Sequence, residues 1–138
     1  MNNNFTFSMI KPEIVEAKQV GEIIMQIEQN GFTIRALELV QLETEDAEEF
    51  YAVHQDRPFY KDLCTYMASG PIIAMVLEKE NAVAEFRKLI GATNPAEANE
   101  GTIRKRFGKS IEENAIHGSD ADETALEEVA FFFPDMVE

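Results

Sequence analysis

The chain has 138 residues, of which 45% are hydrophobic and 28% charged, a composition typical of globular proteins and unlike that of disordered ones. Its 12 Lys and Arg stand against 26 Asp and Glu, and the formal charge of −14 argues against non-specific nucleic-acid binding, because such a surface repels polyanions. The length predicts one domain over residues 1–138.

Cysteine usage and the N-terminal sequence indicate the compartment. Cys64 is the only cysteine, so the chain cannot close an intramolecular disulfide, and a reducing compartment suits it. Residues 1–10 lack the basic and apolar regions of a secretory signal, and no stretch approaches the length of a membrane-spanning helix. We therefore expect a cytoplasmic protein with no membrane contact and no specific nucleic-acid partner.

The first third of the chain predicts a strand, a helix and a second strand. The first strand covers Phe5–Ile10. One continuous helix is expected over Glu13–Asn30, with Gly31 as its left-handed cap. The second strand covers Phe32–Leu42, and its alternation changes phase near Ala36, which indicates a bulge or burial on both faces. The apolar residues of the helix recur at helical spacing: Val20, Ile23, Ile24 and Ile27.

A helical hairpin, a strand and another helix are predicted next. Thr44 is expected to cap the first helix, because two acidic residues in its first turn suit the helix dipole. The second short helix covers Phe59–Ser69 and ends at a Gly-Pro pair. A central strand is expected over Pro71–Glu80, followed by a helix that Asn81 caps and Gly91 ends.

The last third predicts a loop, a strand and a helix. Ala92–Ser110 has no clear period and is predicted to be a long functional loop with one turn of helix. A short strand is expected over Asn114–Ser119, and a helix begins at Asp120 or Asp122 and ends at Pro134. The order of elements predicts an α+β fold of the ferredoxin-like split βαβ kind, a four-stranded antiparallel sheet with helices and an inserted helical hairpin.

A polar cluster around His117 is the first candidate site. The run Asn114-Ala115-Ile116-His117-Gly118-Ser119-Asp120 places an imidazole between an apolar pair and a glycine, just before a helix start. Gly118 allows a ligand to come close, and helix N-terminal amides attract negative charge. Glu128 follows about two turns into the helix, from where it could reach the histidine and serine.

The alternative for His117 is a buried histidine bonded to a backbone carbonyl, which is the commoner fate of a lone histidine. His54 lies at the tail of a helix beside Gln55 and Asp56, and a surface position is expected for it.

Cationic residues in so acidic a chain form the second candidate site. Lys11 ends the first strand, Arg87 lies on a helix, and the run Arg104-Lys105-Arg106 lies in the long loop. Guanidinium and ammonium groups suit phosphate oxygens. Taken singly, each is a solvated or ion-paired surface residue, so only their convergence would make a phosphate site. The standard phosphate-binding motifs are absent from the sequence.

The run from Asn114 to Asp120 resembles the active-site signature of nucleoside diphosphate kinases. The resemblance implies a ping-pong enzyme that passes the γ-phosphate of ATP or another nucleoside triphosphate to a nucleoside diphosphate through a phosphorylated His117. It extends in order over nearly the whole chain, through Lys11-Pro12, Arg57-Pro58-Phe59, Ser69-Gly70-Pro71, Gly91-Ala92-Thr93-Asn94-Pro95-Ala96 and Gly101-Thr102-Ile103-Arg104.

The same resemblance implies roles for further residues. Tyr51, Ser119 and Glu128 would lie beside the histidine and help to fix it. Mg²⁺ would be held mainly by nucleotide phosphates and not by a cage of protein ligands. The nucleotide-binding residues divide into Arg87, Thr93 and Arg104 for the phosphates, Lys11 and Asn114 for the sugar hydroxyl and phosphate region, and Phe59 for stacking on the base.

Assembly and two departures from the family pattern complete the expectations. The resemblance implies a homo-oligomer, either a tetramer or a hexamer. The chain ends soon after Pro134, as in bacterial members that lack a C-terminal extension. Glu13-Ile14 stand where Asp and a small residue are more usual, and Lys105-Arg106 stand where many members have a small residue and Asp.

Two other classes of protein stay open on the sequence, because fold and function are separable. A non-catalytic ferredoxin-like module would bind nucleotides or regulate a partner, and it predicts binding without turnover. A structural, oligomer-forming protein with His117 in its core predicts no phosphate transfer and no effect of nucleotide on melting.

Overall fold

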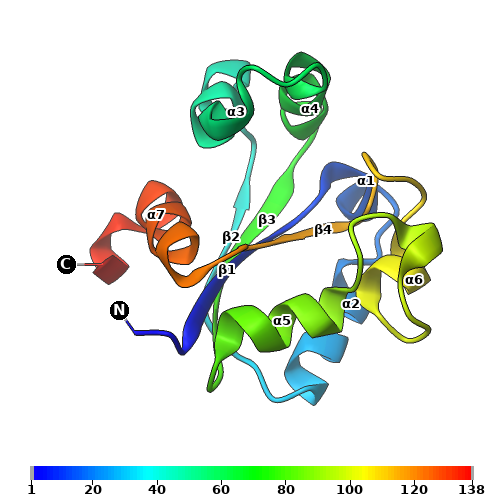
Figure 1. Cartoon of the computed structure of the whole chain (residues 1–138), viewed down its shortest axis with the longest axis vertical. Helices are drawn as coiled ribbons and strands as arrows, with labels where there is room; N and C mark the ends of the chain where they lie inside the picture. Colours follow the sequence, from blue (N-terminus) through cyan, green and yellow to red (C-terminus); the bar gives the residue numbers. More distant parts are fainter. Residues whose placement is uncertain (1, 138) are drawn as a thin grey trace.

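A four-stranded antiparallel sheet forms the centre of the structure, a computed structural model that describes residues 2–137. The strand order β2-β3-β1-β4, with helices between β1 and β2 and between β3 and β4, confirms the predicted ferredoxin-like α+β fold (Figure 1). The strands are β1 (Phe5–Ile10), β2 (Thr33–Val40), β3 (Ile72–Glu78) and β4 (Ile116–Gly118).

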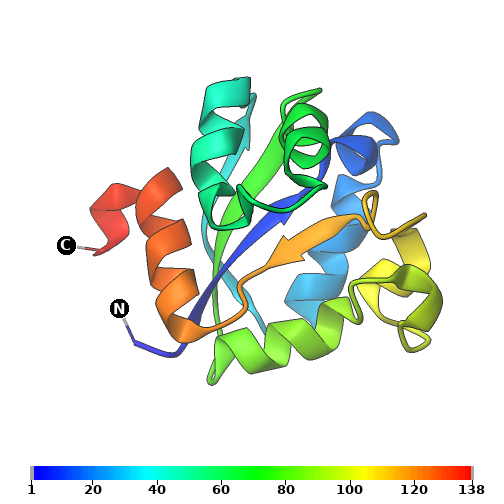
Figure 2. The same ribbon diagram turned by 45° about the horizontal axis from the view of Figure 1, so that its top comes forward.

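The helices surround the sheet on both faces and beyond one end. Helices α3 and α4 form the predicted hairpin, which extends past the ends of β2 and β3 (Figures 1 and 2). The segment predicted as a long loop with one helical turn contains a 3-10 turn, η2, and helix α6. The helices and 3-10 turns are α1 (Pro12–Glu16), α2 (Val20–Gln29), α3 (Thr44–Phe50), η1 (Ala52–His54), α4 (Tyr60–Met67), α5 (Ala82–Ile90), η2 (Pro95–Glu97), α6 (Ile103–Phe107), α7 (Asp122–Phe132) and η3 (Pro134–Val137).

Alternation along β1 divides the apolar core into two layers. Phe7 and Met9 are fully buried on one face, in a cluster with residues of α3, α4 and α7. Ile10 is fully buried on the other face, in a cluster with residues of α2 and α5. Each fully buried side chain of this kind stabilises the fold by about 1.5–3 kcal/mol. The two layers hold the sheet rigidly between the helices.

The single helix predicted over Glu13–Asn30 is wrong, because a Schellman motif ends α1 before α2 begins. Lys18 has a φ of 62°, in the left-handed region, and its amide donates to the Val15 carbonyl. The amide of Gln19 donates to the carbonyl of Ile14. This pair of bonds normally has glycine at its left-handed position. Because lysine and not glycine occupies this position, the sequence gives no sign that the helix ends here.

Two boundaries of β2 and α3 also differ in detail. The register of β2 against β3 shifts between Ile34 and Ala36, so of the two alternatives for this strand the bulge is confirmed. Thr44 was predicted to cap α3 but is its first residue, and Glu43 is the cap. The Glu43 amide donates to Asp46 Oδ2 at 3.0 Å as part of a capping box.

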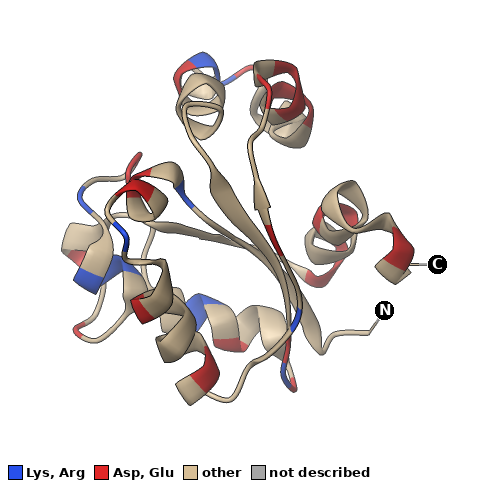
Figure 3. Ribbon diagram, turned by 180° about the vertical axis from the view of Figure 1, so that it is seen from behind, with Lys and Arg blue, Asp and Glu red and all other residues tan. Residues whose placement is uncertain are grey.

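Charged side chains are distributed unevenly over the surface. Asp and Glu are spread over the hairpin, α2 and α7, while Lys and Arg are fewer and scattered (Figure 3). Among residues 2–137 no helix has the length and hydropathy needed to cross a membrane.

Gly91 generates a stability prediction. Its φ is 87°, and a Cβ added there would lie 2.6 Å from Thr102 Oγ1. We expect Gly91→Ala to lower the free energy of unfolding by about 2 kcal/mol or more, through left-handed strain and overpacking. Chemical denaturation measures this change. Gly21→Ala is the control: a Cβ there meets nothing within 4 Å, and we expect stabilisation of about 0.5–1 kcal/mol because alanine favours the helix.

Candidate active site

Strand β4 places His117 on the face of the sheet that carries α3 and α7. His117 pairs with Met9 of β1, so its side chain points to the same side as Phe7 and Met9. The imidazole packs near the rings of Phe7 and Phe50, with centroids 6.1 and 5.8 Å away. Ile116, one residue before, is buried in the opposite core layer.

Gly118 has a packing role that the sequence did not indicate. A Cβ there would lie 2.9 Å from Ile90 Cδ1 and 3.0 Å from Phe86 Cδ2, so the glycine lets α5 approach β4 closely. The prediction was close approach by a ligand; Gly118 also lines the cavity described below, but the tight contact is with α5.

A hydrogen-bonded chain fixes the ring of His117. Nε2 lies 2.9 Å from Glu128 Oε1, and Ser119 Oγ donates to the same oxygen at 2.7 Å. The Ser119 hydroxyl in turn accepts from the Phe7 amide at 3.2 Å, which ties it to β1. The position of Glu128 agrees with the sequence prediction, and the partner of His117 is a carboxylate and not the backbone carbonyl of the alternative reading.

Tyr51 completes the immediate surroundings of the carboxylate. Its side chain is 7% exposed, and burial, followed by the negative charge of Glu128, raises the pKa of its phenol. The hydroxyl therefore keeps its proton at neutral pH and remains a donor.

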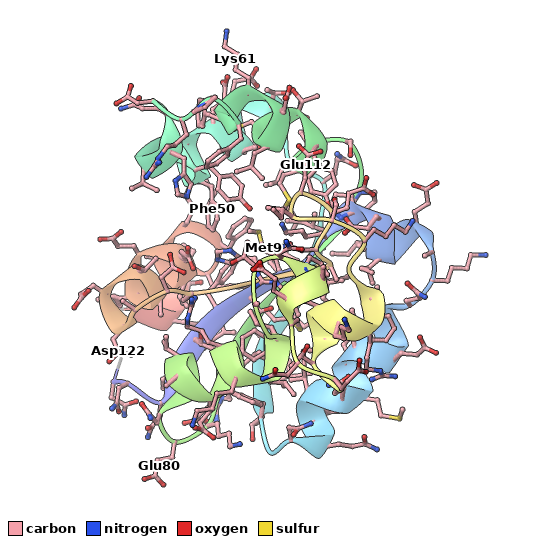
Figure 4. The ribbon with its side chains drawn as sticks, turned by 45° about the vertical axis from the view of Figure 1, so that its right-hand side comes forward. Met9, Phe50, Lys61, Glu80, Glu112 and Asp122 are labelled. Carbon is pink, nitrogen blue, oxygen red and sulfur yellow. The ribbon has the colours of Figure 1, made fainter. Side chains whose placement is uncertain are left out.

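His117 opens into a cavity of about 660 Å³ between the hairpin, the loop before β4 and α7. In Figure 4 Phe50 projects from the hairpin toward the sheet, and Glu112 lies on the loop across from the hairpin. Nine of the ten residues that the sequence singled out line this cavity, and Ser119 lies behind Glu128. The nine are Lys11, Tyr51, Phe59, Arg87, Thr93, Arg104, Asn114, His117 and Glu128.

Three cations converge on the cavity, Lys11 from the junction of β1 and α1, Arg87 from α5 and Arg104 from α6. Lys11 is 7% exposed and Arg104 is 9% exposed. Neither is therefore the solvated surface residue that was the alternative for each cation taken alone. Burial, and then the charge of Arg104, lower the pKa of Lys11 to about 8. Burial, and then Arg87, lower the pKa of Arg104 to about 10. The three side chains repel one another, and a polyanion would relieve this repulsion.

The two arginines are held in different ways. Arg104 donates to the carbonyls of Gly91 at 3.0 Å and Ile116 at 2.8 Å, which fixes its guanidinium beside β4. Arg87 pairs with Asp120 at 2.8 Å near the surface. Lys105 and Arg106, which follow Arg104 in the sequence, are not among the residues that line the cavity.

Asn114 presents an unused acceptor. Its amide nitrogen donates to the Thr93 carbonyl at 3.0 Å, which joins the two predicted residues. Its Oδ1 is buried and has no hydrogen-bond partner among residues 2–137. Because buried polar atoms are nearly always paired, this atom points to a bound group that donates a hydrogen bond.

Several cavity residues were missed or misjudged from the sequence. Ile111 was not singled out from the sequence, but it is 60% exposed and lines the cavity. Phe59, which the resemblance had singled out, is 47% exposed and lines the cavity as well. His54, expected at the surface, is half-buried, and its ring lies near those of Tyr51 and Phe59, with centroids 6.5 and 5.5 Å away. Phe50 was assigned only to the apolar side of its helix, although that side faces the histidine.

Acidic side chains in the cavity could accompany a metal ion without enclosing one. Within the described part of the chain, no three His, Cys, Asp or Glu side chains are grouped to hold a metal. Asp120 and Glu127 line the cavity and offer carboxylate oxygens, which are the ligands that Mg²⁺ prefers. This donor set fits an ion held mainly by the phosphates of a ligand.

Comparison with known proteins assigns the family. The family model described as nucleoside diphosphate kinase matches residues 4–137. The chain is 55% identical to a nucleoside diphosphate kinase of Flavobacterium psychrophilum over 96% of both chains, and 53% identical to one of Geobacter sp. (strain M21) over 93% of both. The chain belongs to the nucleoside diphosphate kinase family, and its enzymatic activity is that of a nucleoside diphosphate kinase.

Solved structures agree with this assignment. The nucleoside diphosphate kinase of Aquifex aeolicus superposes with a TM-score of 0.92 at 41% identity, over 94% of each chain. The halophilic enzyme of Halobacterium salinarum, solved in complex with CDP, superposes with a TM-score of 0.92 at 36% identity, over 98% of this chain and 90% of that one.

The lowered pKa of Lys11 predicts a pH dependence of nucleotide binding. With a pKa of about 8 in the free protein, Lys11 is cationic below that pH and neutral above it. The dissociation constant for ADP, measured by calorimetry, should therefore rise about tenfold between pH about 7 and about 9.5, as one charged contact is lost. Lys11→Met should bind weakly throughout and lose the step near pH 8. A step that persists in this variant would assign it to another group.

Proposed function

We propose that the chain transfers the γ-phosphate of a nucleoside triphosphate to a nucleoside diphosphate by a ping-pong mechanism, through a phosphate carried on His117. The observation that supports this most directly is the imidazole itself, held at Nε2 and facing a cavity that contains three cations. A covalent intermediate lets one cavity serve the donor and the acceptor in turn. The reaction would balance the pools of NTPs and dNTPs.

Nδ1 of His117 is the proposed nucleophile. An ionised carboxylate only accepts hydrogen bonds, so Nε2 beside Glu128 carries the proton of the neutral ring and Nδ1 keeps its lone pair. Nδ1 attacks the γ-phosphorus, and a P–N bond forms as the bond to the β,γ-bridging oxygen breaks. The diphosphate leaves with that electron pair. A terminal β-phosphate oxygen of the acceptor then attacks the same phosphorus and returns the lone pair to Nδ1.

Glu128, Ser119 and Tyr51 are proposed to position the ring and to offset its charge. The ring gains positive charge as the P–N bond forms, and the Glu128 carboxylate at 2.9 Å stabilises it. Ser119 donates to the same carboxylate and keeps it in place. Tyr51, with its raised pKa, supports the same wall of the cavity as a neutral phenol.

Arg87, Arg104 and Thr93 are proposed to hold the phosphates. Phosphoryl transfer depends mainly on positioning and charge neutralisation, which fixed guanidinium groups provide. Arg104 is fixed by two carbonyls and remains cationic at neutral pH, with a pKa of about 10. Arg87 is free to exchange its exposed partner Asp120 for a phosphate, because a surface ion pair is worth little.

Lys11, Asn114 and Phe59 are proposed to bind the sugar and base. The unpaired Oδ1 of Asn114 can accept from a ribose hydroxyl, and Lys11 lies in the same wall of the cavity. Phe59 can stack on a base, with Ile111 as a second apolar surface. Stacking does not depend on base identity, so broad nucleotide specificity follows. The Halobacterium salinarum relative was solved in complex with CDP, which supports nucleotide binding by this chain.

Mg²⁺ is the proposed cofactor. The carboxylates of Asp120 and Glu127 are among the oxygen donors of the cavity that Mg²⁺ prefers, and the nucleotide phosphates would supply the rest. The ion would neutralise phosphate charge during transfer.

One domain over residues 1–138 and a cytoplasmic location are also proposed. The match of the family model to residues 4–137 supports a single nucleoside diphosphate kinase domain. Cys64 is a free and buried thiol, which suits the reducing cytoplasm.

A homo-oligomer, tetramer or hexamer, is proposed, and β2 is the surface best suited to a subunit contact. β2 lies at the edge of the sheet and exposes Leu37 and Leu39 by 46% and 61%. An exposed apolar edge strand favours pairing with another chain, and natural proteins normally cover such an edge.

Substitution of this edge tests the assembly. We expect Leu39→Glu to shift the protein toward smaller species in sedimentation velocity, because each buried leucine contributes about 1.5–3 kcal/mol to a contact. Leu126→Glu is the control, since Leu126 is similarly exposed at 43% but lies on α7. Equal behaviour of the two variants would argue against β2 as the contact.

The phosphoenzyme can be tested directly. Wild-type protein mixed with γ-labelled ATP and Mg²⁺ should take up label that is stable in base, labile in acid, and transferred to GDP when it is added. His117→Ala should take up none. Since the chain has two histidines and both lie at the cavity, His54→Ala is the matched control and should still be labelled. Binding of ATP without uptake of label by the wild type would favour the non-catalytic binding module.

A further inference from the structure

A carboxylate on α1 supports the turn that leads into β4. Glu13 Oε2 accepts a hydrogen bond from the Ala115 amide at 3.1 Å. The other oxygen of Glu13 accepts from the hydroxyl of Tyr66 on α4. Between them, Glu13 and Tyr66 connect α1 and α4 to a backbone amide two residues before His117. Neither residue lines the cavity.

The backbone at Ala115 is strained. Its φ is 79°, and the amide of Ile116 donates to the carbonyl of Asn114 at 3.0 Å across it. Together these define a classic γ-turn, which is rare because its central residue lies in an unfavourable region. A non-glycine residue in this region is strained and persists only when its surroundings hold it in place.

The turn decides where the site residues Asn114 and His117 point. Asn114 precedes it and directs its side chain into the cavity, whereas Ile116 follows it and begins β4. Relaxation at Ala115 would rotate the start of β4, and His117 would move relative to Glu128. The carbonyl of Ala115 is held as well, by the Lys11 amide at 2.9 Å. Ala115 is fully buried, and the Glu13 carboxylate is the hydrogen-bond acceptor of its amide.

We propose that Glu13, held by Tyr66, is a positioning residue that maintains the strained turn at Ala115 and so keeps His117 in line for attack on the γ-phosphorus. This inference rests on the proposed phosphohistidine mechanism. The role is carried by hydrogen bonds and not by charge. Loss of the bonds misplaces the nucleophile, and misplacement by about 1 Å is enough to lower a rate by about 100-fold.

A competing role for Glu13 is electrostatic. Its carboxylate is one of the charges that raise the pKa of Lys11 against the larger effect of burial. Glutamine separates the two roles, because it has no charge but offers an oxygen to the Ala115 amide and an NH₂ group to the Tyr66 oxygen. Alanine removes both the charge and the bonds.

The test measures the single-turnover rate of His117 phosphorylation by ATP and Mg²⁺, together with the dissociation constant for ADP, in the full chain. Glu13→Ala should lower the phosphorylation rate by about 10- to 100-fold while the dissociation constant changes by less than about threefold. Glu13→Gln should stay within about threefold of the wild-type rate. Tyr66→Phe, which keeps the ring and removes one bond, should show a smaller loss than Glu13→Ala.

Controls separate this inference from the mechanism on which it rests. Glu16→Ala removes an exposed carboxylate from the same helix and should leave the rate unchanged. An equal loss in Glu13→Ala and Glu13→Gln, or a shifted pH step in ADP binding at an unchanged rate, would overturn the hydrogen-bond role in favour of charge. A wild type that is phosphorylated and a Glu13→Ala variant that matches it would overturn the inference alone. Only failure of the wild type to be phosphorylated would overturn the mechanism.

Discussion

Lys11, Arg87 and Arg104 keep three positive charges at one cavity, and the fold has to offset both their repulsion and the burial of two of them. Arg104 is secured by the carbonyls of Gly91 and Ile116. Lys11 is left with a lowered pKa, a sign that its desolvation is only partly compensated. This incomplete compensation destabilises the free protein. It also strengthens the binding of a polyanion, because the polyanion neutralises the buried charges.

The three-residue strand β4 joins this charged site to the core. Ile116 and Gly118 face α5, and Gly118 allows close contact with Phe86. His117 lies between these two residues in the sequence and faces the cavity on the other side of the strand. Because side chains alternate along a strand, a histidine flanked by two core positions cannot shift by one residue without displacing both of them from the core. The imidazole is therefore positioned by the packing of its neighbours as well as by its bond to Glu128, as a preorganised site requires.

The sequence predicted what depends on periodicity and on local spacing. All four strands, the hairpin and the reach of Glu128 toward His117 follow from such patterns. It could not predict features set by residues that take an unusual backbone conformation: lysine at position 18 and alanine at position 115 both adopt positive φ values, for which glycine is the usual signal. It also could not place Ile111 at the cavity, because this residue reaches the cavity only through the tertiary fold.

The acidic balance of the chain bears on the form in which a nucleotide binds. Three cations line the cavity, but so do four carboxylates, those of Glu112, Asp120, Glu127 and Glu128, so the cavity itself is not strongly positive. The overall charge of −14 adds little to the electrostatic potential in the cavity, because charges farther away than a Debye length of about 8–10 Å are screened. A bare triphosphate would meet the cations and the carboxylates together. A triphosphate that carries a divalent cation presents positive charge to the carboxylates and negative charge to the cations, and this complementarity is the physical reason to expect the metal complex, and not the free nucleotide, as the substrate.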